Sequence, residues 1–290
     1  MLAVRRLKEK TIKVLLFITA LVAVVGVILI TIFVFGKGWP FWEKYGLFKS
    51  LMGRVWLPNL DGESIFGLVP LIVGSFCVTA IASLLAVPLG VGCAIYLAEI
   101  ASDLWSRMFR PAVSLLAAIP SVVYGFFGLI VLVPVIRDFF GGLGFSLLAG
   151  GIILAIMILP TIIAVSEDAI RAVPKSYKEA SLALGASRWQ TIYRTIVPAA
   201  RSGIIAAVIL GIGRALGETM AVIMVTGNRP LIPKSILDPG VTLTGTIGTE
   251  WAYASGEHTT ALFAVGSVLF VLIMLINSIA IVIKNKGELK

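Results

Sequence analysis

The sequence predicts an all-α integral membrane protein with six transmembrane helices. Of its 290 residues, 59% are hydrophobic and only 13% are charged, whereas soluble proteins carry about 25% charged residues. The apolar residues gather into six long runs that contain almost no charges. Each run reaches the roughly 20 residues that a helix needs to cross a bilayer, and a helix satisfies its own backbone polar groups inside lipid.

The six runs follow one another along the chain. They cover residues 14–35, 64–98, 111–136, 139–166, 202–228 and 259–283. The first run follows a basic segment and so resembles a signal peptide, but it is too long for one and lacks a convincing cleavage site. We therefore expect a tail at 1–13 and a retained, peripheral first helix at 14–36.

The second run has 35 residues, more than a bilayer requires, so its beginning near residues 67–70 is expected at or outside the membrane surface. The preceding segment 37–66 is an aromatic-rich external loop, for which we expect either a helix on the membrane surface or a platform for an external partner. Residues 67–283 then form a core of five helices that includes a large loop at 167–201. A short tail at 284–290 ends the chain.

The distribution of basic residues predicts the orientation. Six spans place both termini on one side, and with the termini inside, 16 lysines and arginines fall in cytoplasmic segments and seven in external ones. Basic residues are enriched in cytoplasmic loops. We therefore expect both termini in the cytoplasm, and this scatter of charge explains the net charge of +9 better than a nucleic-acid partner does.

Several chemistries are excluded by the motifs. The chain lacks the G-x-x-x-x-G-K-[ST] loop that holds nucleotide phosphates, so any ATP hydrolysis belongs to another chain. Gly213 and Gly217 have the G-x-x-x-G spacing that is typical of contacts between membrane helices, and they do not belong to a dinucleotide-binding motif. His258 is the sole histidine and has no ligand-spaced neighbour, so we expect no catalytic site, no metal and no cofactor on this chain.

The loop 167–201 predicts a rigid corner. Its sequence reads as a short helix after Pro174, a stop at Gly185 and a second helix from about Ser187. Glycine accepts a left-handed backbone, so the two helices can meet at a sharp turn. Such a corner could be gripped by a partner protein, or it could be a solvated connection between spans.

The fifth run alone contains charges, Arg214 and Glu218. On one continuous helix, Glu218 lies one turn from Arg214 on the same face. A charge at mid-membrane costs at least a few kcal/mol, so it is expected to face a partner or a substrate. Two readings are open: a path for an oxyanion, which suits the planar donor fork of arginine, or a neutral salt bridge that ties two spans together.

Within the path reading, Glu218 either orients Arg214 or accepts a hydrogen bond from a protonated oxyanion such as hydrogen phosphate. Two other classes compete with a partner-driven transporter. An intramembrane enzyme could use Glu218 as a general base but lacks a nucleophile or metal constellation. A self-contained, ion-coupled carrier would suit the buried charges but gives the cytoplasmic corner no purpose.

The corner also resembles a known motif. Glu179-Ala180-Ser181, Gly185 and Pro198 are similar to the E-A-A, three residues, G, nine residues, I-x-L-P motif of ABC-importer permeases. Ser181 replaces an alanine, and Thr195 and Val197 replace isoleucine and leucine. The resemblance implies a type I permease fold in which Glu179, Ala180 and Gly185 belong to the helix that couples to the ATPase.

Further segments resemble the phosphate-specific permeases, and the run Met220-Ala221-Val222 with Gly227-Asn228 is more similar to their C subunit than to their A subunit. This resemblance covers most of the chain from Gly67 onward. It implies import of inorganic phosphate across the inner membrane of a prokaryote. The implied partners are an A-type permease, two ATPase subunits that hold the ATP, and an external phosphate-binding protein. A permease for another oxyanion, sulfate or molybdate, is the alternative.

Overall fold

The computed structural model describes residues 2–58 and 64–288. Six long helices dominate: α1 (Leu2–Tyr45), α3 (Val69–Ile95), α4 (Asp103–Ala118), α7 (Leu147–Arg171), α11 (Arg201–Gly217) and α14 (Glu257–Glu288). The shorter elements are α2 (Leu47–Leu51), β1 (Trp56–Leu57), β2 (Ile65–Phe66), α5 (Ser121–Phe127), α6 (Val133–Phe140), α8 (Lys175–Ala183), α9 (Arg188–Thr191), α10 (Val197–Ala199), α12 (Met220–Val225) and α13 (Leu243–Glu250). Three π-helical segments, 96–100, 128–132 and 192–196, lie between them.

The predicted all-α membrane fold is confirmed. Among the described residues, five helices are long and apolar enough to cross a membrane, and a sixth is added if the pair Arg188–Ala199 and Arg201–Gly217, bent by 68°, is one span. The third and fourth spans differ from their predicted bounds. Helix α4 ends before Pro120, which cannot continue it, and the candidate span is Ser121–Phe140. Helix α7 begins only at Leu147, because glycines 141, 142 and 144 adopt positive φ and end the preceding helix.

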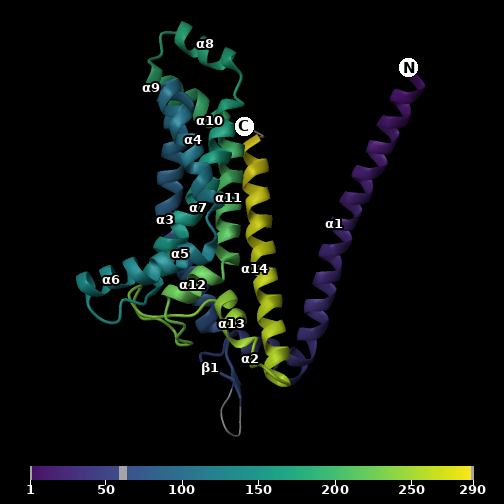
Figure 1. The fold of residues 1–290 in the computed structure, drawn as a ribbon, viewed down its shortest axis with the longest axis vertical. Coiled ribbons are helices and arrows are strands. Elements are labelled where there is room, and N and C mark those ends of the chain that lie inside the picture. Colours follow the sequence, from purple (N-terminus) through teal and green to yellow (C-terminus); the bar gives the residue numbers. More distant parts are fainter. Residues whose placement is uncertain (1, 59–63, 289–290) are drawn as a thin grey trace.

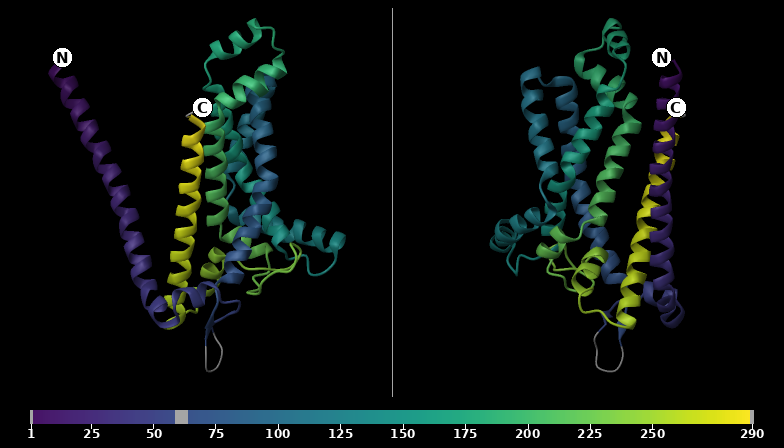
Figure 2. Two further views of the ribbon diagram at one scale, coloured as in Figure 1. Left: turned by 180° about the vertical axis from the view of Figure 1, so that it is seen from behind. Right: turned by 45° about the vertical axis from the view of Figure 1, so that its right-hand side comes forward.

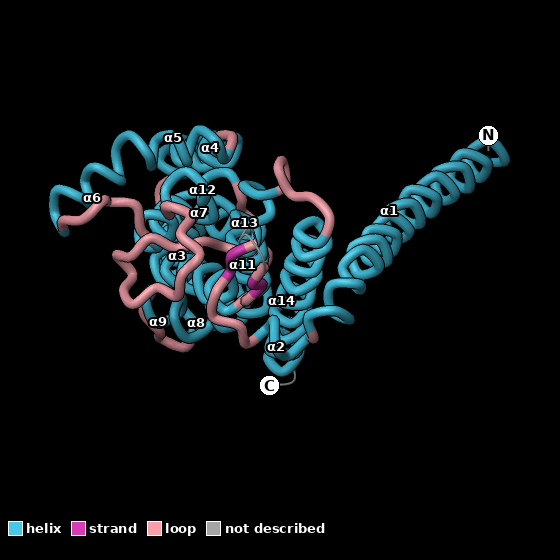
Figure 3. Tube along the Cα trace, turned by 90° about the horizontal axis from the view of Figure 1, so that it is seen from below, coloured by secondary structure: helices cyan, strands magenta, loops and turns pink. Residues whose placement is uncertain are grey.

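Helix α7 lies at the centre of the bundle, between α3 and α11 (Figures 1 and 3). Ile153, Ile158 and Ile162 on α7 are fully buried, as is Ala82 on α3. Glycine allows the two helices to approach closely, since a Cβ at Gly151 would lie 2.3 Å from the Ile81 side chain. This packing provides the rigid frame on which the neighbouring helices α11 and α14 rest.

Helix α1 lies at the edge of the molecule (Figures 1 and 2). The carboxyl-terminal part of α1 meets α14, and the amino-terminal part of α1 diverges from α14. The rings of Phe33 and Phe35 pack edge-on against Phe263 and Phe270 of α14. Most described side chains of its apolar stretch are exposed. This surface suits contact with lipid, which solvates apolar side chains.

The segment 37–66 contains the end of α1, the short helix α2 and two paired strands, and the expected helix on the membrane surface stays a prediction. Helix α1 continues to Tyr45, and β1 and β2 form a hairpin that pairs Trp56 with Phe66. Phe41 and Trp56 are each only 1% exposed and face inward, whereas Trp39 and Phe48 are 59% and 77% exposed. The expected platform for an external partner stays a prediction.

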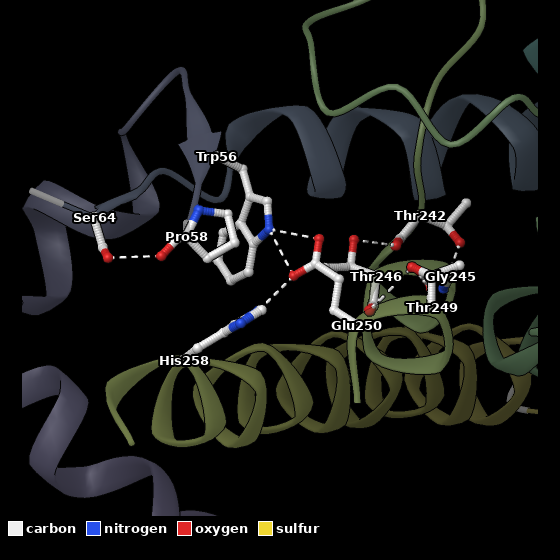
Figure 4. Close-up of polar contacts among 9 residues, drawn as sticks. All are labelled: Trp56, Pro58, Ser64, Thr242, Gly245, Thr246, Thr249, Glu250 and His258. Carbon is white, nitrogen blue, oxygen red and sulfur yellow. Dashed lines mark hydrogen bonds and ion pairs between the residues drawn. The ribbon is translucent and has the colours of Figure 1, made fainter. Parts of the chain in front are cut away.

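The hairpin is fastened to the two last helices by a buried polar cluster (Figure 4). The indole Nε1 of Trp56 donates to both carboxylate oxygens of Glu250, at 3.0 and 3.1 Å. The His258 Nε2 lies 2.6 Å from the same carboxylate. Because Glu250 ends α13 and His258 lies in the first turn of α14, one carboxylate joins these two neighbouring helices to the hairpin, which is 194 residues away along the chain.

Candidate functional site

Arg214 lies in the last turn of α11 and faces an open groove. The groove has a volume of about 780 Å³ and is lined by α7, α11 and α14. The guanidinium Nη1 donates to the Thr161 hydroxyl on α7 at 3.3 Å, and this is its only hydrogen bond to the described part of the chain. An arginine has five N–H donors. Most of its donors are therefore free to meet a ligand.

Arg214 and Glu218 do not lie on one continuous helix, so that part of the prediction was wrong. Helix α11 ends at Gly217, Glu218 has an extended backbone with ψ 132°, and α12 begins at Met220. The Glu218 Oε1 accepts from the Ala221 backbone N–H at 3.1 Å. A carboxylate at a helix amino terminus is favoured by the helix dipole, and glycine is a poor helix former, so Gly217-Glu218 ends one helix and starts another.

The two charged residues lie in different environments. No ion pair joins Arg214 to Glu218 in the described structure. Glu218 borders a small cavity of about 10 Å³, which has room for no more than about one water molecule. The salt-bridge reading of this pair therefore finds no contact to support it.

Hydroxyl groups surround the Glu218 cavity, and sequence reasoning missed them. Four of them line it, from Ser75, Thr79, Thr242 and Thr244. The Thr244 hydroxyl donates to the Glu218 backbone carbonyl at 2.7 Å, and the Ser75 hydroxyl accepts from the Leu243 N–H at 2.9 Å. The alternating threonines at 242, 244 and 246 were a signal in the sequence, but nothing there placed them beside Glu218.

The corner in the loop 167–201 is confirmed as predicted. Helix α8 follows Pro174, Gly185 adopts φ +82°, and Ser187 begins α9 with a capping box that includes Gln190. No side chain of α8 is buried, and Glu179, Ala180 and Gly185 are exposed. The corner projects from the end of the bundle near which both termini lie (Figure 1). Its surface is thus available for a partner.

Polar contacts fix the corner to the bundle. The Lys178 Nζ lies 2.5 Å from a carboxylate oxygen of Glu99, beyond the end of α3. The Ser181 and Thr191 hydroxyls, 3.0 Å apart, join α8 to α9. These contacts connect the corner to the segment that follows α3.

A buried carboxylate lies beneath this corner. Glu167 on α7 accepts from the Arg110 Nε at 2.8 Å and from the Arg171 Nε at 2.9 Å. Arg171 also donates to the Leu97 carbonyl at 2.7 Å. Sequence reasoning did not select these residues, although Glu167 at the end of an apolar run was visible.

The sequence from residue 86 to 286 matches a known family, the binding-protein-dependent transport system inner membrane component. The matched range contains the corner, Arg214 and Glu218. The chain belongs to this family. Members of this family are permease components, so the expectation of a transporter subunit rather than an enzyme is confirmed.

Two curated relatives of this permease cover most of its length. The probable ABC transporter permease protein YqgH of Bacillus subtilis is 43% identical over 274 residues, 92% of this chain and 88% of that protein. The phosphate transport system permease protein PstC of Mesorhizobium japonicum is 38% identical over 272 residues, 87% of this chain and 82% of that protein. The predicted resemblance to phosphate-specific permeases is thus confirmed.

Solved structures confirm the fold. A bacterial alginate ABC transporter in complex with its periplasmic protein has a TM-score of 0.60 at 16% identity, covering 92% of both chains. An inward-facing form of the MetNI methionine ABC transporter has a TM-score of 0.58 at 20% identity, covering 75% of this chain and 96% of that one. The permease therefore has the type I ABC-importer fold that its corner motif implied.

Proposed function

We propose that this permease translocates inorganic phosphate into the cytoplasm, driven by ATP hydrolysis on separate ATPase chains. The observation that carries the proposal is the Arg214 guanidinium. It lies in a largely apolar groove with only one hydrogen bond to the described residues, in a chain similar to proteins named as phosphate permeases. A charge within a membrane span is costly and is typical of a substrate path.

The chemistry of arginine supports an oxyanion as substrate. The guanidinium stays charged at every physiological pH, and its planar fork gives two parallel hydrogen bonds to a phosphate. Glu218 then acts separately, because it has no contact with Arg214. Its carboxylate accepts a hydrogen bond from a protonated phosphate oxygen in a state of the transport cycle in which the small cavity beside it has widened. Sulfate has no such proton near neutral pH, which favours phosphate over sulfate or molybdate.

The exposed corner and the similarity to ABC importer permeases support the proposed partners. The corner with Glu179, Ala180 and Gly185 docks on an ATPase dimer, an A-type permease completes the membrane part, and an external phosphate-binding protein delivers the ion. The chain is placed in the inner membrane of a prokaryote with both termini in the cytoplasm. A self-contained, ion-coupled carrier would need none of these partners.

Reconstitution tests this proposal. Proteoliposomes that contain the permease, its A-type partner and the ATPase, with the external binding protein, should take up labelled phosphate only when ATP is present on the cytoplasmic side. Uptake by the permease without an ATPase would favour the ion-coupled carrier. Equal uptake of sulfate or molybdate after exchange of the binding protein alone would show that the permease does not select phosphate.

Single cysteines test the orientation. We expect cysteines that replace Arg5 or Lys286 to react only with reagents on the cytoplasmic side, and a cysteine that replaces Lys44 to react from outside, because basic residues concentrate in the cytoplasmic segments. Labelling with a membrane-impermeant maleimide in intact cells and in inverted vesicles measures this. Reaction of position 5 from outside would overturn the orientation.

A further inference from the structure

Two polar side chains share the groove with Arg214: Thr161 from α7 and Asn277 from α14. The other six residues that line the groove are alanine, isoleucine, leucine and glycine. Within a membrane span, polar groups are costly unless they meet a partner, and they commonly mark a substrate site. Neither Thr161 nor Asn277 was selected from the sequence.

Asn277 has no hydrogen-bond partner within the described ranges, although it is half-buried and lies, beside Ser278, in a mostly apolar part of α14. Helices α11 and α14 run antiparallel (Figure 1), and their groove-lining residues run from Ala206 to Arg214 on α11 and from Ile281 to Ile273 on α14. This order places Asn277 about one helical turn from Arg214, toward the cytoplasmic end. Side chains in a helix tilt toward its amino terminus, so the Arg214 side chain leans toward the level of Asn277.

The Thr161 hydroxyl lacks the local backbone bond that several other threonines of the chain make. The hydroxyls of Thr31, Thr226, Thr246 and Thr249 each donate to the backbone carbonyl four residues earlier, as threonine commonly does in helices. The Thr161 hydroxyl instead accepts from Arg214 at 3.3 Å, and its own proton has no acceptor in the described structure. Thr161 therefore presents an unused donor to the groove.

We propose that Thr161 and Asn277 bind the transported oxyanion together with Arg214, so that three helices contribute to one site. Arg214 supplies the positive charge, the Asn277 amide two N–H donors and Thr161 one O–H donor. A tetrahedral oxyanion such as hydrogen phosphate has acceptor oxygens for all of them. This inference rests on the proposed phosphate path and adds its contacts on α7 and α14.

The test compares uptake with ATP hydrolysis in the same vesicles. Proteoliposomes of the whole transporter, with saturating external binding protein, receive labelled inorganic phosphate. Thr161→Val and Asn277→Leu should each lower uptake by about tenfold or more, the usual effect of losing a hydrogen bond to a charged group. ATP hydrolysis stimulated by the loaded binding protein should stay within about twofold of the parent value. The phosphate imported per ATP therefore falls.

Three further variants distinguish the loss of a contact to the oxyanion from a structural effect of the substitution. Thr161→Ser keeps the hydroxyl and should keep uptake. Ser278→Ala removes the neighbouring polar group of α14, which faces a different groove beside α1, and should also keep it. Asn277→Asp has the same shape, should assemble because its carboxylate can pair with Arg214, and should abolish uptake because it occupies those donors and repels an anion.

The inference is overturned if Asn277→Asp transports normally, or if uptake and ATP hydrolysis fall together in Thr161→Val and Asn277→Leu. Its failure can be told apart from failure of the phosphate path. If Arg214→Met blocks uptake while Asn277→Leu and Thr161→Val do not, the path stands and only the added contacts are wrong. If Arg214→Met also transports normally, the path itself is wrong.

Discussion

Arg214→Met should lower phosphate uptake by about a hundredfold or more in a transporter that still assembles. The guanidinium gives at least two hydrogen bonds to a bound oxyanion, and each hydrogen bond to a charged group contributes about 1.5–3 kcal/mol. Methionine fills a similar volume without charge or donors. Labelled phosphate uptake in vesicles, with assembly verified by copurification of the partner subunits, measures the effect.

The double variant Arg214→Met with Glu218→Gln decides between path and salt bridge. If the two residues only neutralised one another, removing both charges would relieve their burial and leave transport intact. In the path reading the double variant is inactive, and Glu218→Gln alone is milder than Arg214→Met because the positive contact remains. The control Arg137→Met removes an exposed arginine that pairs with Asp138, and it should leave uptake within about twofold. Near-normal uptake by the assembled double variant would contradict the anion path.

The membrane helices and the cytoplasmic corner could be predicted because both are local signals. Apolar runs of about 20 residues report helices through composition alone. Gly185 and Ser187 predict the corner because a left-handed turn and a capping box depend only on the residues that form them. The third span shows the limit of this reading: the apolar run 111–136 is continuous in composition, but Pro120 breaks its helix.

The environment of the charged pair could be predicted only in part. The segment Gly217-Glu218-Thr219 is polar and contains a glycine, but apolar residues on both sides make the composition typical of one continuous span, so the helix break was not predicted. The hydroxyls around Glu218 come from segments more than 20 residues away along the chain, such as Thr244, and from α3, such as Ser75. Sequence spacing carries no information about such contacts. The same holds for Glu250, which meets Trp56 across 194 residues.

The corner is mechanically connected to the bundle that carries Arg214. Lys178 on α8 pairs with Glu99 beyond α3, and α3 packs along α7, which contributes Thr161 to the groove. A partner that holds α8 can therefore move the helices of the site without touching them. We therefore expect the geometry at Gly185 to be decisive for coupling.

Gly185→Val should uncouple the permease from its ATPase while leaving it inserted in the membrane. At φ +82° a β-branched side chain strains the backbone by about 1–2 kcal/mol or more, so the corner changes shape. A steric clash within this chain does not cause the expected loss of coupling, since a Cβ at Gly185 would meet no atom within 4 Å. We expect ATPase copurification and phosphate-stimulated ATP hydrolysis to fall by about tenfold or more.

Two further variants identify the cause. Asparagine tolerates the left-handed region, so Gly185→Asn should retain coupling if backbone strain is responsible and lose it if any side chain obstructs docking. Gly142 has φ +75° and equally open surroundings, but it follows α6 in the loop before α7, away from the corner. Gly142→Val therefore imposes similar strain elsewhere and should leave coupling unchanged. Normal copurification and normal stimulated hydrolysis with Gly185→Val would show that the corner does not transmit ATP hydrolysis to the membrane helices.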